Sequence, residues 1–313
     1  MINLSIIIPF YNVEKYIAQC LDSVFNQDIP EEEFEVICVN DVSPDNSRDI
    51  VREYQRKHVN LILIEHDINK KLGGARNTGI RAAKGKYILF LDSDDMLKPN
   101  SLKSLVSEID SQQDDYIHFN YQKFYNDGSM GEELLFKVDN IQTTGVELFF
   151  SKNLAWQHQI SACRKIYRRD FLLSNNLFFV EDIMYEDNDF SMRVAAAANK
   201  CRHLDISPYL YRQNQESVTK APISSSRLIY WQKTWPIIVA LLDTIGKQDV
   251  RFVDLIRFYI RYDLWDVLNN LYKLPRDQRK IVKQNMSITE WLRYISFLPL
   301  KRRIEYTYKL IKA

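Results

Sequence analysis

Two acidic side chains follow an apolar run in the first third of the chain. Asp92 and Asp94, with Asp95 beside them, come directly after Tyr87 to Leu91. Alternation along an extended backbone places Asp92 and Asp94 on one side, where two carboxylates repel each other unless a cation lies between them. Mg²⁺ and Mn²⁺ prefer such oxygen ligands and commonly complete them with substrate phosphates and water. The spacing therefore indicates a divalent metal beside a nucleotide diphosphate; the alternative is an acidic cap on a helix that begins near Pro99 to Ser101.

A second acidic cluster lies almost a hundred residues further along the chain. Three carboxylates, Glu186, Asp187 and Asp189, precede a helix expected through Met192 to Ala198. One of them could act as a general base, because a partly buried, acidic pocket raises the pKa of a carboxyl group. The residue types alone favour the alternative, in which these acids cap the N-terminus of the helix.

Polar groups also follow other apolar segments. Asp41 could accept hydrogen bonds from a nucleotide base or ribose, and Asp45 could do the same or cap the next helix, which is the favoured role. The stretch Gly73 to Asn77 offers bare backbone amides and the guanidinium of Arg76 at a helix start. That combination suits a phosphate group, and the alternative is that the glycines serve close packing.

The elements that must position these groups alternate through the first hundred residues. Leu4 to Phe10 is a continuous apolar run, typical of a strand covered on both faces, and from Val13 apolar residues recur at helical spacing as far as Phe25. Further strands are expected at Phe34–Val39, Leu61–Ile64 and Tyr87–Leu91, with helices around 50–54 and from Gly73 to Ala83. Such alternation predicts a largely parallel sheet, which binds ligands at the carboxyl ends of its strands.

The remainder of the chain is less regular and then helical. The expected elements are an edge or antiparallel strand over Tyr116–Phe124, a helix over Thr144–Phe150 and a short amphipathic stretch over Arg168–Asn175. Beyond about Ser224 the pattern is helical, with Pro236 as an early-turn residue or a kink and Pro275 as a break between helices. We therefore expect a mixed α/β domain over residues 1–222 and a helical region over residues 223–313.

Composition excludes several classes of protein. Apolar residues make up 46% and charged residues 27% of the 313 residues, as in ordinary globular proteins. The 42 Lys and Arg against 41 Asp and Glu give a net charge of +1, which makes no case for binding nucleic acid. Four widely spaced cysteines without a C-x-x-C pair, and no signal-like start, fit a reducing cytoplasm. The longest apolar stretch, Trp235 to Leu242, is too short to span a bilayer.

The order and spacing of these segments resemble the family 2 inverting glycosyltransferases, which have the GT-A fold. Ser5 to Asn12 resembles the opening strand and Pro-x-Tyr-Asn turn of that family, and Val39 to Ser47 resembles its V-D-D-G-S-T-D-N-S loop. Gly74 to Gly79 is similar to the A-A-R-N-x-G helix start. Phe90 to Asp95 is similar to the F-L-D-S-D-D metal motif.

The resemblance continues in the second half of the chain and covers roughly residues 3–220. Lys165 to Arg169 is similar to the N-K-L-Y-R-R segment, and Tyr185 to Asp187 is similar to the E-D motif. Tyr211 and Arg212, with Ser217 to Thr219, resemble the closing Y-R…S-I-T element.

The resemblance implies a fold. This is a GT-A domain, with a Rossmann-like, mostly parallel sheet flanked by helices, followed by a C-terminal helical extension. Residues 1–115 would form the nucleotide-sugar-binding half, residues 116–222 the acceptor-side half and residues 223–313 the helical region.

The resemblance also implies which residues bind the donor. Pro9, Tyr11 and Asp41 would line the nucleotide base and ribose. Asp92 and Asp94 would form the D-x-D pair of a nucleotide-sugar site that uses Mg²⁺ or Mn²⁺. Asp94 would be the direct metal ligand.

The acceptor side follows from the second acidic motif. By the same resemblance, Asp187 would be the general base that removes a proton from the acceptor hydroxyl, and Glu186 is the competing choice. Arg76, Lys165 and Arg212 would contact the diphosphate or the acceptor.

The implied activity is metal-dependent, inverting transfer of a hexosyl or N-acetylhexosaminyl group. The donor would be a nucleotide-diphosphate sugar, in the first instance a UDP-sugar, and the acceptor a hydroxyl of a glycan or lipid-linked saccharide in bacterial surface-polysaccharide synthesis. Two alternatives stay open: a catalytically silent sugar-nucleotide-binding or assembly protein, and a sugar nucleotidyltransferase. The latter usually carries a glycine-rich loop with Arg and Lys where this chain has Pro9 to Asn12.

Four positions depart from the pattern of the family. Asn40 replaces the first acid of the D-D pair and Val42 replaces its glycine, which leaves the donor preference open. Cys163 and Arg164 stand where the family usually has tryptophan and asparagine, which leaves the acceptor side open.

The end of the chain could contact a membrane. Phe297 to Lys312 mixes apolar residues with Lys and Arg, and a basic amphipathic helix can rest on an anionic membrane surface, here the inner face of the cytoplasmic membrane. The alternative is that the aromatic residues of the helical region pack on the main domain or on a second subunit in a homodimer. These aromatic residues are Trp231, Trp235, Trp265 and Trp291.

Overall fold

The computed structural model of the chain describes residues 2–136, 142–151, 159–183, 185–214, 224–244, 250–296, 298 and 300–312. The chain divides into two compact units, residues 1–182 with 186–215 and residues 183–185 with 216–313. We call them the α/β unit and the helical unit. The domain boundary predicted at residue 222 and the segment Ser217 to Thr219 lie outside the described residues.

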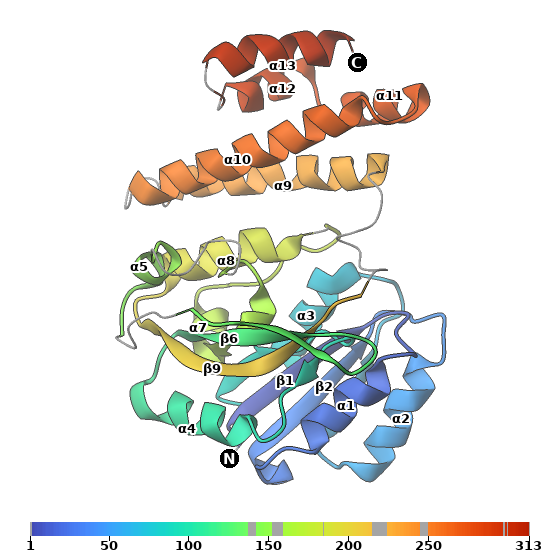
Figure 1. Cartoon of the computed structure of the whole chain (residues 1–313), viewed down its shortest axis with the longest axis vertical. Coiled ribbons are helices and arrows are strands. Elements are labelled where there is room, and N and C mark those ends of the chain that lie inside the picture. Colours follow the sequence, from blue (N-terminus) through green and yellow to red (C-terminus); the bar gives the residue numbers. More distant parts are fainter. Residues whose placement is uncertain are drawn as a thin grey trace. The chain divides into compact units, whose positions relative to one another are not determined.

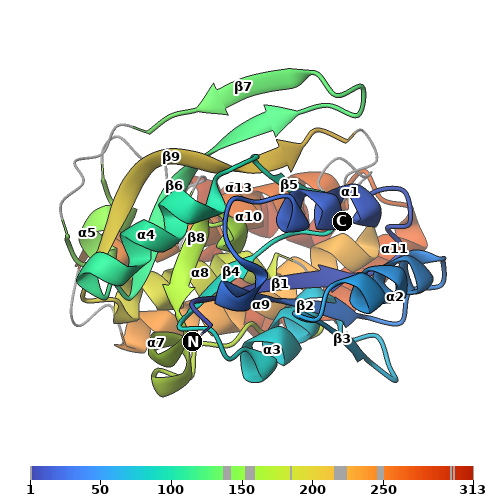
Figure 2. The same ribbon diagram turned by 90° about the horizontal axis from the view of Figure 1, so that it is seen from below.

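Among the described residues of the α/β unit, nine strands form one sheet. Its order is β3-β2-β1-β4-β8-β6-β9-β5, and β7 pairs with β6 as a hairpin (Figure 2). The strands are β1 (Leu4–Phe10), β2 (Phe34–Asn40), β3 (Leu61–Glu65), β4 (Tyr87–Phe90), β5 (Met96–Leu97), β6 (Tyr116–Phe124), β7 (Met130–Leu134), β8 (Lys165–Arg168) and β9 (Cys201–Arg212).

The first four strands are parallel and match the predicted runs to within one residue. Every residue of β1 and β2 is buried, as expected where helices cover both faces of a sheet. The register places Ile7 opposite Phe90 and Phe10 opposite Asn40. The carboxyl ends of β1, β2 and β4 therefore lie at one edge, which brings together the polar residues that follow them.

The second half of the sheet is mixed. The strand β6 runs antiparallel to β8 and β7, which agrees with the prediction of an antiparallel strand. The alternative prediction of an edge strand is wrong, because β8 and β9 flank β6. Its alternating polar residues are buried and paired instead of exposed. His118 Nδ1 lies 2.9 Å from His203 Nδ1, and Asn120 donates to Asp205 at 2.8 Å.

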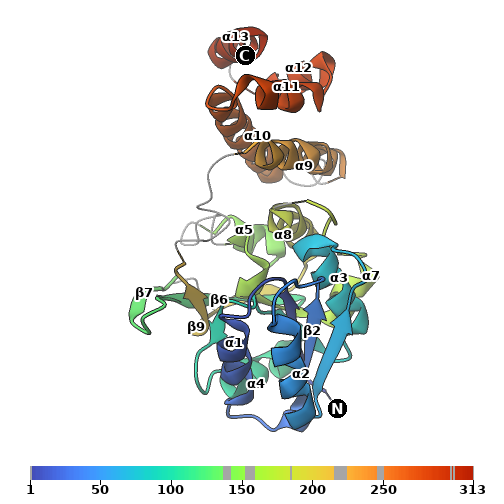
Figure 3. The same cartoon turned by 90° about the vertical axis from the view of Figure 1, so that its right-hand side faces the viewer.

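Helices cover both faces of the sheet. Figures 1 and 3 show α1, α2 and α4 on one face and α3, α5 and α8 on the other. The helices are α1 (Ile17–Phe25), α2 (Ser47–Lys57), α3 (Lys71–Ala82), α4 (Leu102–Gln112), α5 (Gly145–Phe149), α7 (Arg169–Ser174) and α8 (Glu186–Ala197), with 3-10 turns η1 (Glu31–Glu33) and η2 (Ala162–Arg164). The change of face after α2 follows from the strand order, because β3 to β4 crosses in the opposite direction and right-handed crossovers keep their hand.

Two helix starts differ from prediction. The helix expected from Val13 begins at Ile17, since the preceding residues form a turn in which Tyr16 N donates to the carbonyl of Val13. The helix expected to open at Gly73 begins earlier, at Lys71, so that both glycines of the pair lie within α3.

The helical unit contains α9 (Ser225–Thr244), α10 (Val250–Leu271), α11 (Arg276–Gln284), α12 (Ile288–Ile295) and α13 (Leu300–Lys312). Pro275 precedes α11, which confirms the predicted break, but Pro236 lies in the interior of α9 and is not an early-turn residue. Within the described ranges, no helix combines the length and the apolar character that a bilayer-spanning segment requires.

Two tryptophans form part of the core of the helical unit. Trp235 and Trp291 are buried and pack edge to face, with ring centroids 5.9 Å apart. Within the helical unit these two tryptophans therefore pack on each other, and the alternatives of the main domain or a second subunit stay predictions. The side chains of Trp231 and Trp265 lie outside the described residues.

Candidate active site

Arg76 joins the two acidic clusters. Its guanidinium is buried, and Nη2 donates to Asp92 Oδ1 at 2.8 Å. On the other side, Nη1 donates to Glu186 Oε1 at 2.8 Å and to Asp187 Oδ1 at 2.5 Å. Two groups of carboxylates that are almost a hundred residues apart in sequence therefore share one cation. The hypothesis that they meet in a common site depends on this contact, and the geometry agrees with it.

Close packing of α3 places Arg76 at this point. A Cβ atom added at Gly79 would lie 2.3 Å from Cγ2 of Ile7 on β1, and one added at Gly73 would lie 2.7 Å from the carbonyl oxygen of Val180. Of the two interpretations of the glycines, phosphate binding and close packing, the structure supports packing. The guanidinium of Arg76 is engaged with three carboxylates, so it positions them, and the predicted diphosphate contact of Arg76 stays a prediction.

The start of α8 presents two carboxylates of different character. The Asp187 side chain is 22% exposed and that of Glu186 only 7%. Asp187 Oδ2 also accepts a hydrogen bond from the backbone N–H of Ala162 at 3.2 Å. Burial raises the pKa of Glu186, while the neighbouring Arg76 opposes that rise. Asp187 is thus the carboxylate that an incoming hydroxyl group can reach, and Glu186 is held behind it.

The third acid of this cluster is not part of the site. Asp189 is fully buried and accepts two hydrogen bonds from Nε of Arg193, at 3.1 Å and 2.9 Å, within the same helix. This i, i+4 ion pair stabilises α8 and leaves Asp189 no free face.

Asp92, Asp94 and Asp95 lie in a turn after β4. The backbone N–H of Asp95 donates to the carbonyl of Asp92 at 2.9 Å, so strand alternation does not explain how the first two aspartates come together. The side chains interact all the same, because burial and the negative charge of Asp92 raise the pKa of Asp94 to about 6. Asp95 has a structural role: it accepts from Tyr209 Oη at 2.5 Å and from the backbone N–H of Arg212 at 2.7 Å.

The acidic turn does not cap α4. The backbone N–H groups of Ser101 and Leu102 donate to Gln27 Oε1 at 2.9 Å and 3.1 Å, and that of Lys103 donates to Asp28 Oδ1 at 3.1 Å. The helix start is therefore satisfied by residues that follow α1. This excludes the capping interpretation and leaves Asp92 and Asp94 for another role.

The two aspartates fit a divalent cation. They supply hard oxygen ligands, and the negative charge of Asp92 adds to the effect of burial in raising the pKa of Asp94. Across the described parts of the chain, no three His, Cys, Asp or Glu side chains are grouped so that they could hold a metal ion. A cation held here would thus depend on substrate oxygens and water for its remaining ligands, as is common for Mg²⁺.

The carboxyl ends of β1 and β2 carry three more of the predicted site residues. Pro9 is buried and Tyr11 is exposed just beyond β1. Asp41 is buried, and its Oδ1 lies 2.8 Å from Nδ1 of His66 and accepts from the backbone N–H of Lys70 at 2.8 Å. The structure therefore brings Pro9, Tyr11 and Asp41 to the same strand ends, with one oxygen of Asp41 already engaged.

His66 is a residue that the sequence did not single out. Its Nε2 lies 2.9 Å from Thr78 Oγ1, so that the imidazole connects Asp41 to α3. Sequence reasoning treats each histidine as a surface or packing residue, since none lies at a metal-ligand spacing. His66 lies next to Asp41 because of the register of β3 beside β2, and no local sequence pattern predicts this contact.

The loop after β2 departs from the pattern of the family at Asn40 and Val42. Val42 has φ of +65°, the left-handed conformation for which glycine is suited. Asn40 Oδ1 accepts from the backbone N–H of Ser43 at 2.9 Å and so closes the turn. Asp45 Oδ1 accepts from Ser47 N at the start of α2, which agrees with the favoured capping role.

Val42→Gly is expected to increase the free energy of unfolding by about 1 kcal/mol. A β-branched side chain at positive φ destabilises the folded state by roughly 1–2 kcal/mol, and glycine removes this strain. The greater conformational freedom of glycine in the unfolded chain offsets only part of that stabilisation. Urea denaturation measures the change. The matched control is Val59→Gly, at an exposed valine without positive φ, which should not stabilise the protein. Equal effects of the two substitutions would contradict strain at Val42.

Lys165 is engaged by backbone carbonyl groups. It is buried, and its ammonium group donates to the backbone carbonyls of Gln159 and Ser161. Burial lowers the pKa of Lys165 to about 7. These hydrogen bonds attach Lys165 to the segment that leads into η2, and the predicted diphosphate or acceptor contact of Lys165 stays a prediction.

Arg212 is hydrogen-bonded to the turn that carries Asp94. Its Nε donates to the backbone carbonyl of Asp94 at 2.5 Å, and its two terminal nitrogens donate to Asn126 Oδ1 at 3.1 Å and Gln19 Oε1 at 2.9 Å. These contacts hold Asp94 in place. The predicted contact of Arg212 with diphosphate or acceptor has no counterpart in these hydrogen bonds.

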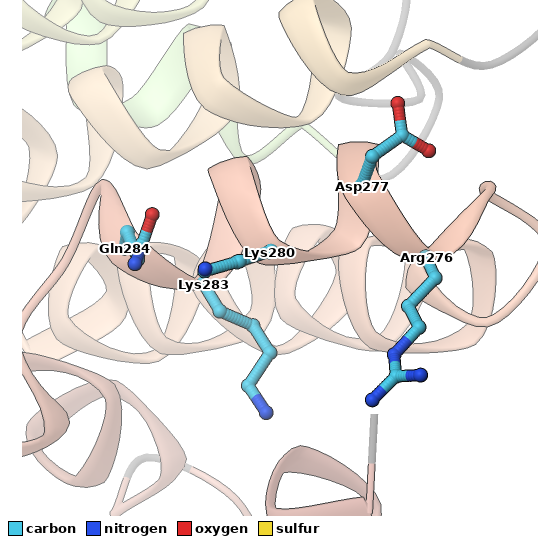
Figure 4. A pocket seen from close by; sticks show the side chains of 5 residues that line it. All are labelled: Arg276, Asp277, Lys280, Lys283 and Gln284. Atoms are coloured by element: carbon cyan, nitrogen blue, oxygen red, sulfur yellow. The ribbon is translucent and has the colours of Figure 1, made fainter.

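Two cavities lie beside the described elements. One, of about 400 Å³, adjoins Arg212 between α1 and the β6–β7 hairpin. The other, of about 770 Å³, lies along α11 and is lined by Arg276, Asp277, Lys280, Lys283 and Gln284 (Figure 4). The first belongs to the α/β unit and the second to the helical unit.

The fold and the site define a class of enzyme. The family model described as "Glycosyl transferase family 2" matches residues 5–173, which is more than half of the chain. The chain therefore belongs to glycosyltransferase family 2, and it is a glycosyltransferase. This confirms the resemblance noted in the sequence and overturns the nucleotidyltransferase alternative.

Relatives are bacterial glycosyltransferases. The chain is 31% identical over 291 residues to the uncharacterized glycosyltransferase EpsJ of Bacillus subtilis (strain 168), with 90% of this chain and 83% of that protein covered. It is 32% identical over 226 residues to the poly(ribitol-phosphate) beta-N-acetylglucosaminyltransferase TarS of Staphylococcus aureus (strain MW2), covering 69% of this chain and 36% of TarS. The chain thus corresponds to about a third of TarS.

Solved structures confirm the predicted GT-A architecture. The crystal structure of S. aureus TarS 1–349 in complex with UDP-GlcNAc superimposes with a TM-score of 0.74 at 24% identity, covering 99% of this chain and 88% of that one. At this identity the likeness concerns the fold. The agreement extends to the helical extension after the α/β unit.

Proposed function

We propose that this glycosyltransferase moves a hexosyl or N-acetylhexosaminyl group from a nucleotide-diphosphate sugar to a hydroxyl group of a glycan or lipid-linked saccharide, with inversion at the anomeric carbon. The observation that carries the proposal is the shared contact of Arg76 with Asp92 and Asp187. This contact supports the proposal because the carboxylate proposed for the leaving group and the one proposed for the incoming alcohol bind the same guanidinium.

Asp187 is the general base in this proposal. As the hydroxyl oxygen attacks the anomeric carbon, Asp187 accepts the hydroxyl proton, and the bond to the nucleotide diphosphate breaks on the opposite face. The ion pair with Arg76 keeps Asp187 oriented. The hydrogen bond from Ala162 N fixes its second oxygen, so that proton acceptance needs little rearrangement.

Asp92 and Asp94 serve the leaving diphosphate. Mg²⁺ or Mn²⁺ held by these carboxylates would offset the negative charge that develops on the leaving group. The protein positions the pair from two sides: Arg76 donates to the side chain of Asp92, and Arg212 donates to the backbone of Asp94. Asp94, which lacks the ion pair of Asp92, is the more available direct ligand.

The comparisons support a UDP-sugar as donor. TarS, which shares 32% identity with this chain over 226 residues, is named an N-acetylglucosaminyltransferase and was crystallised with UDP-GlcNAc. Pro9, Tyr11 and Asp41 at the strand ends are the proposed base and ribose contacts. We place the enzyme in bacterial surface-polysaccharide synthesis on the cytoplasmic side, where nucleotide sugars are available, and the intact Asp94 and Asp187 argue against a catalytically silent assembly protein.

Titration calorimetry with Mn²⁺ and UDP tests the donor site. Asp94→Ala is expected to abolish the manganese-dependent part of UDP binding, because it removes the better available metal ligand. The matched control is Asp170→Ala, at an exposed aspartate on α7, which should bind as the wild type does. Unchanged binding by Asp94→Ala would defeat the metal assignment. A thermal-shift screen of UDP-, GDP- and dTDP-sugars with Mn²⁺ then identifies the nucleotide.

A further inference from the structure

The last helix carries an exposed apolar stripe. Four large apolar side chains of α13 are more than half exposed: Leu300 (71%), Ile304 (70%), Tyr308 (57%) and Ile311 (70%). Their spacing of four, four and three residues places them on one face of the helix. The other apolar residues, Tyr306 and Leu310, are buried and attach α13 to the rest of the helical unit. The helix therefore has a second apolar face that is largely exposed.

The same part of the chain is strongly basic. Residues 276–312 contain ten Lys and Arg against three Asp and Glu, which is a net charge of +7 in a chain whose total is +1. Arg276, Lys280 and Lys283 line the cavity on α11 (Figure 4), and among the described residues none of the three forms an ion pair with a carboxylate. The segment thus keeps a net positive charge, although Arg302 pairs with Glu305 within α13.

We propose that α13 docks on an anionic lipid bilayer. The helix would lie in the plane of the membrane, with its exposed stripe at the boundary of headgroups and acyl chains and the basic residues of 276–312 attracted to lipid phosphates. A helix of 13 residues is about 20 Å long, which suits this placement and not a membrane span. The apolar stripe supplies burial and the net charge supplies attraction to an anionic surface.

A second copy of the chain fits this surface less well. In a symmetric contact the positive segment would face its own copy, and like charges repel. A stable protein interface also buries about 800 Å² on each partner, more than four side chains of a single helix provide. A polyanion such as nucleic acid would satisfy the cations but would leave the apolar stripe in water. Only a bilayer with anionic headgroups over an apolar interior would contact both the basic residues and the apolar stripe.

Vesicle co-sedimentation of the full chain tests the proposal. The probes are vesicles of phosphatidylcholine with phosphatidylglycerol at about 3:1 and vesicles of phosphatidylcholine alone. Binding is expected for the first and not for the second, and it should fall as NaCl rises from about 0.05 M to 0.3 M, because salt screens the attraction. Ile304→Ser should weaken binding by about tenfold, because it removes an apolar side chain that would be buried in the membrane.

The matched control is Ile68→Ser, which removes an equally exposed isoleucine (69%) from the α/β unit and should leave vesicle binding unchanged. Circular dichroism and calorimetry with UDP check that Ile304→Ser keeps the fold and the donor site. Absence of wild-type binding to the anionic vesicles, or equal binding by Ile304→Ser, would overturn the proposal. So would light scattering that shows an oligomer of the wild type which Ile304→Ser dissociates. None of these outcomes bears on whether the donor is a UDP-sugar.

Discussion

Replacement of Asp187 by asparagine is expected to lower turnover by about 10²- to 10⁴-fold, the usual contribution of a positioned general base. Asparagine keeps the size of the side chain and can still accept a hydrogen bond from Arg76, but it cannot take the acceptor proton. UDP binding should stay within about twofold of the wild type, because Asp187 touches the donor-side carboxylates only through Arg76. Steady-state kinetics and calorimetry on the same preparation separate the two effects.

Glu186→Gln is the matched control for this prediction. Glu186 is more deeply buried than Asp187 and is therefore less accessible to an acceptor hydroxyl group. Its turnover should therefore fall much less than that of Asp187→Asn. The reverse ranking of the two variants would transfer the role of base to Glu186.

Arg76→Met is expected to have the largest effect on stability, with a loss of about 3–5 kcal/mol in the free energy of unfolding. Removal of one partner of a buried ion pair leaves an uncompensated charge, and here three carboxylates lose their common cation. Guanidinium denaturation measures the loss. Activity should fall as well, because Asp92 and Asp187 would no longer be held together.

Two further variants separate lost electrostatics from lost packing. Arg81→Met changes an exposed arginine of the same helix and should cost less than about 0.5 kcal/mol. Adding Asp92→Asn to Arg76→Met should recover part of the lost stability, because one of the unpaired charges is removed. If Arg76→Met costs less than about 1 kcal/mol, or if the second change gives no recovery, the bridging role is wrong.

The sequence predicts the donor half of the fold well because its signals are local. The first four strands are apolar runs within the chain itself, and the helices between them have clear periodicity. The positions of Asp41, Asp92 and Asp187 at element ends follow from the same patterns. A parallel sheet gathers the ends of its strands at one edge, so the meeting of distant residues can be inferred without coordinates.

What the sequence does not predict depends on contacts between distant elements. The strand β6 looks half exposed because His118 and Asn120 are polar, yet β9 pairs with both. The N-terminus of α4 is capped by Gln27, which follows a different helix. Arg76, Lys165 and Arg212 likewise resemble phosphate ligands in the sequence. No local pattern indicates that carboxylates or backbone carbonyls of the protein accept hydrogen bonds from these side chains.

The contact between Gly79 and Ile7 has a consequence for genetics. Any side chain at position 79 would collide with β1 at 2.3 Å and push away the helix that carries Arg76. A screen for inactive alleles would therefore recover changes at a residue that touches neither sugar nor nucleotide. Collections of inactive alleles of this enzyme will therefore suggest too many catalytic residues unless each mutant protein is also checked for correct folding.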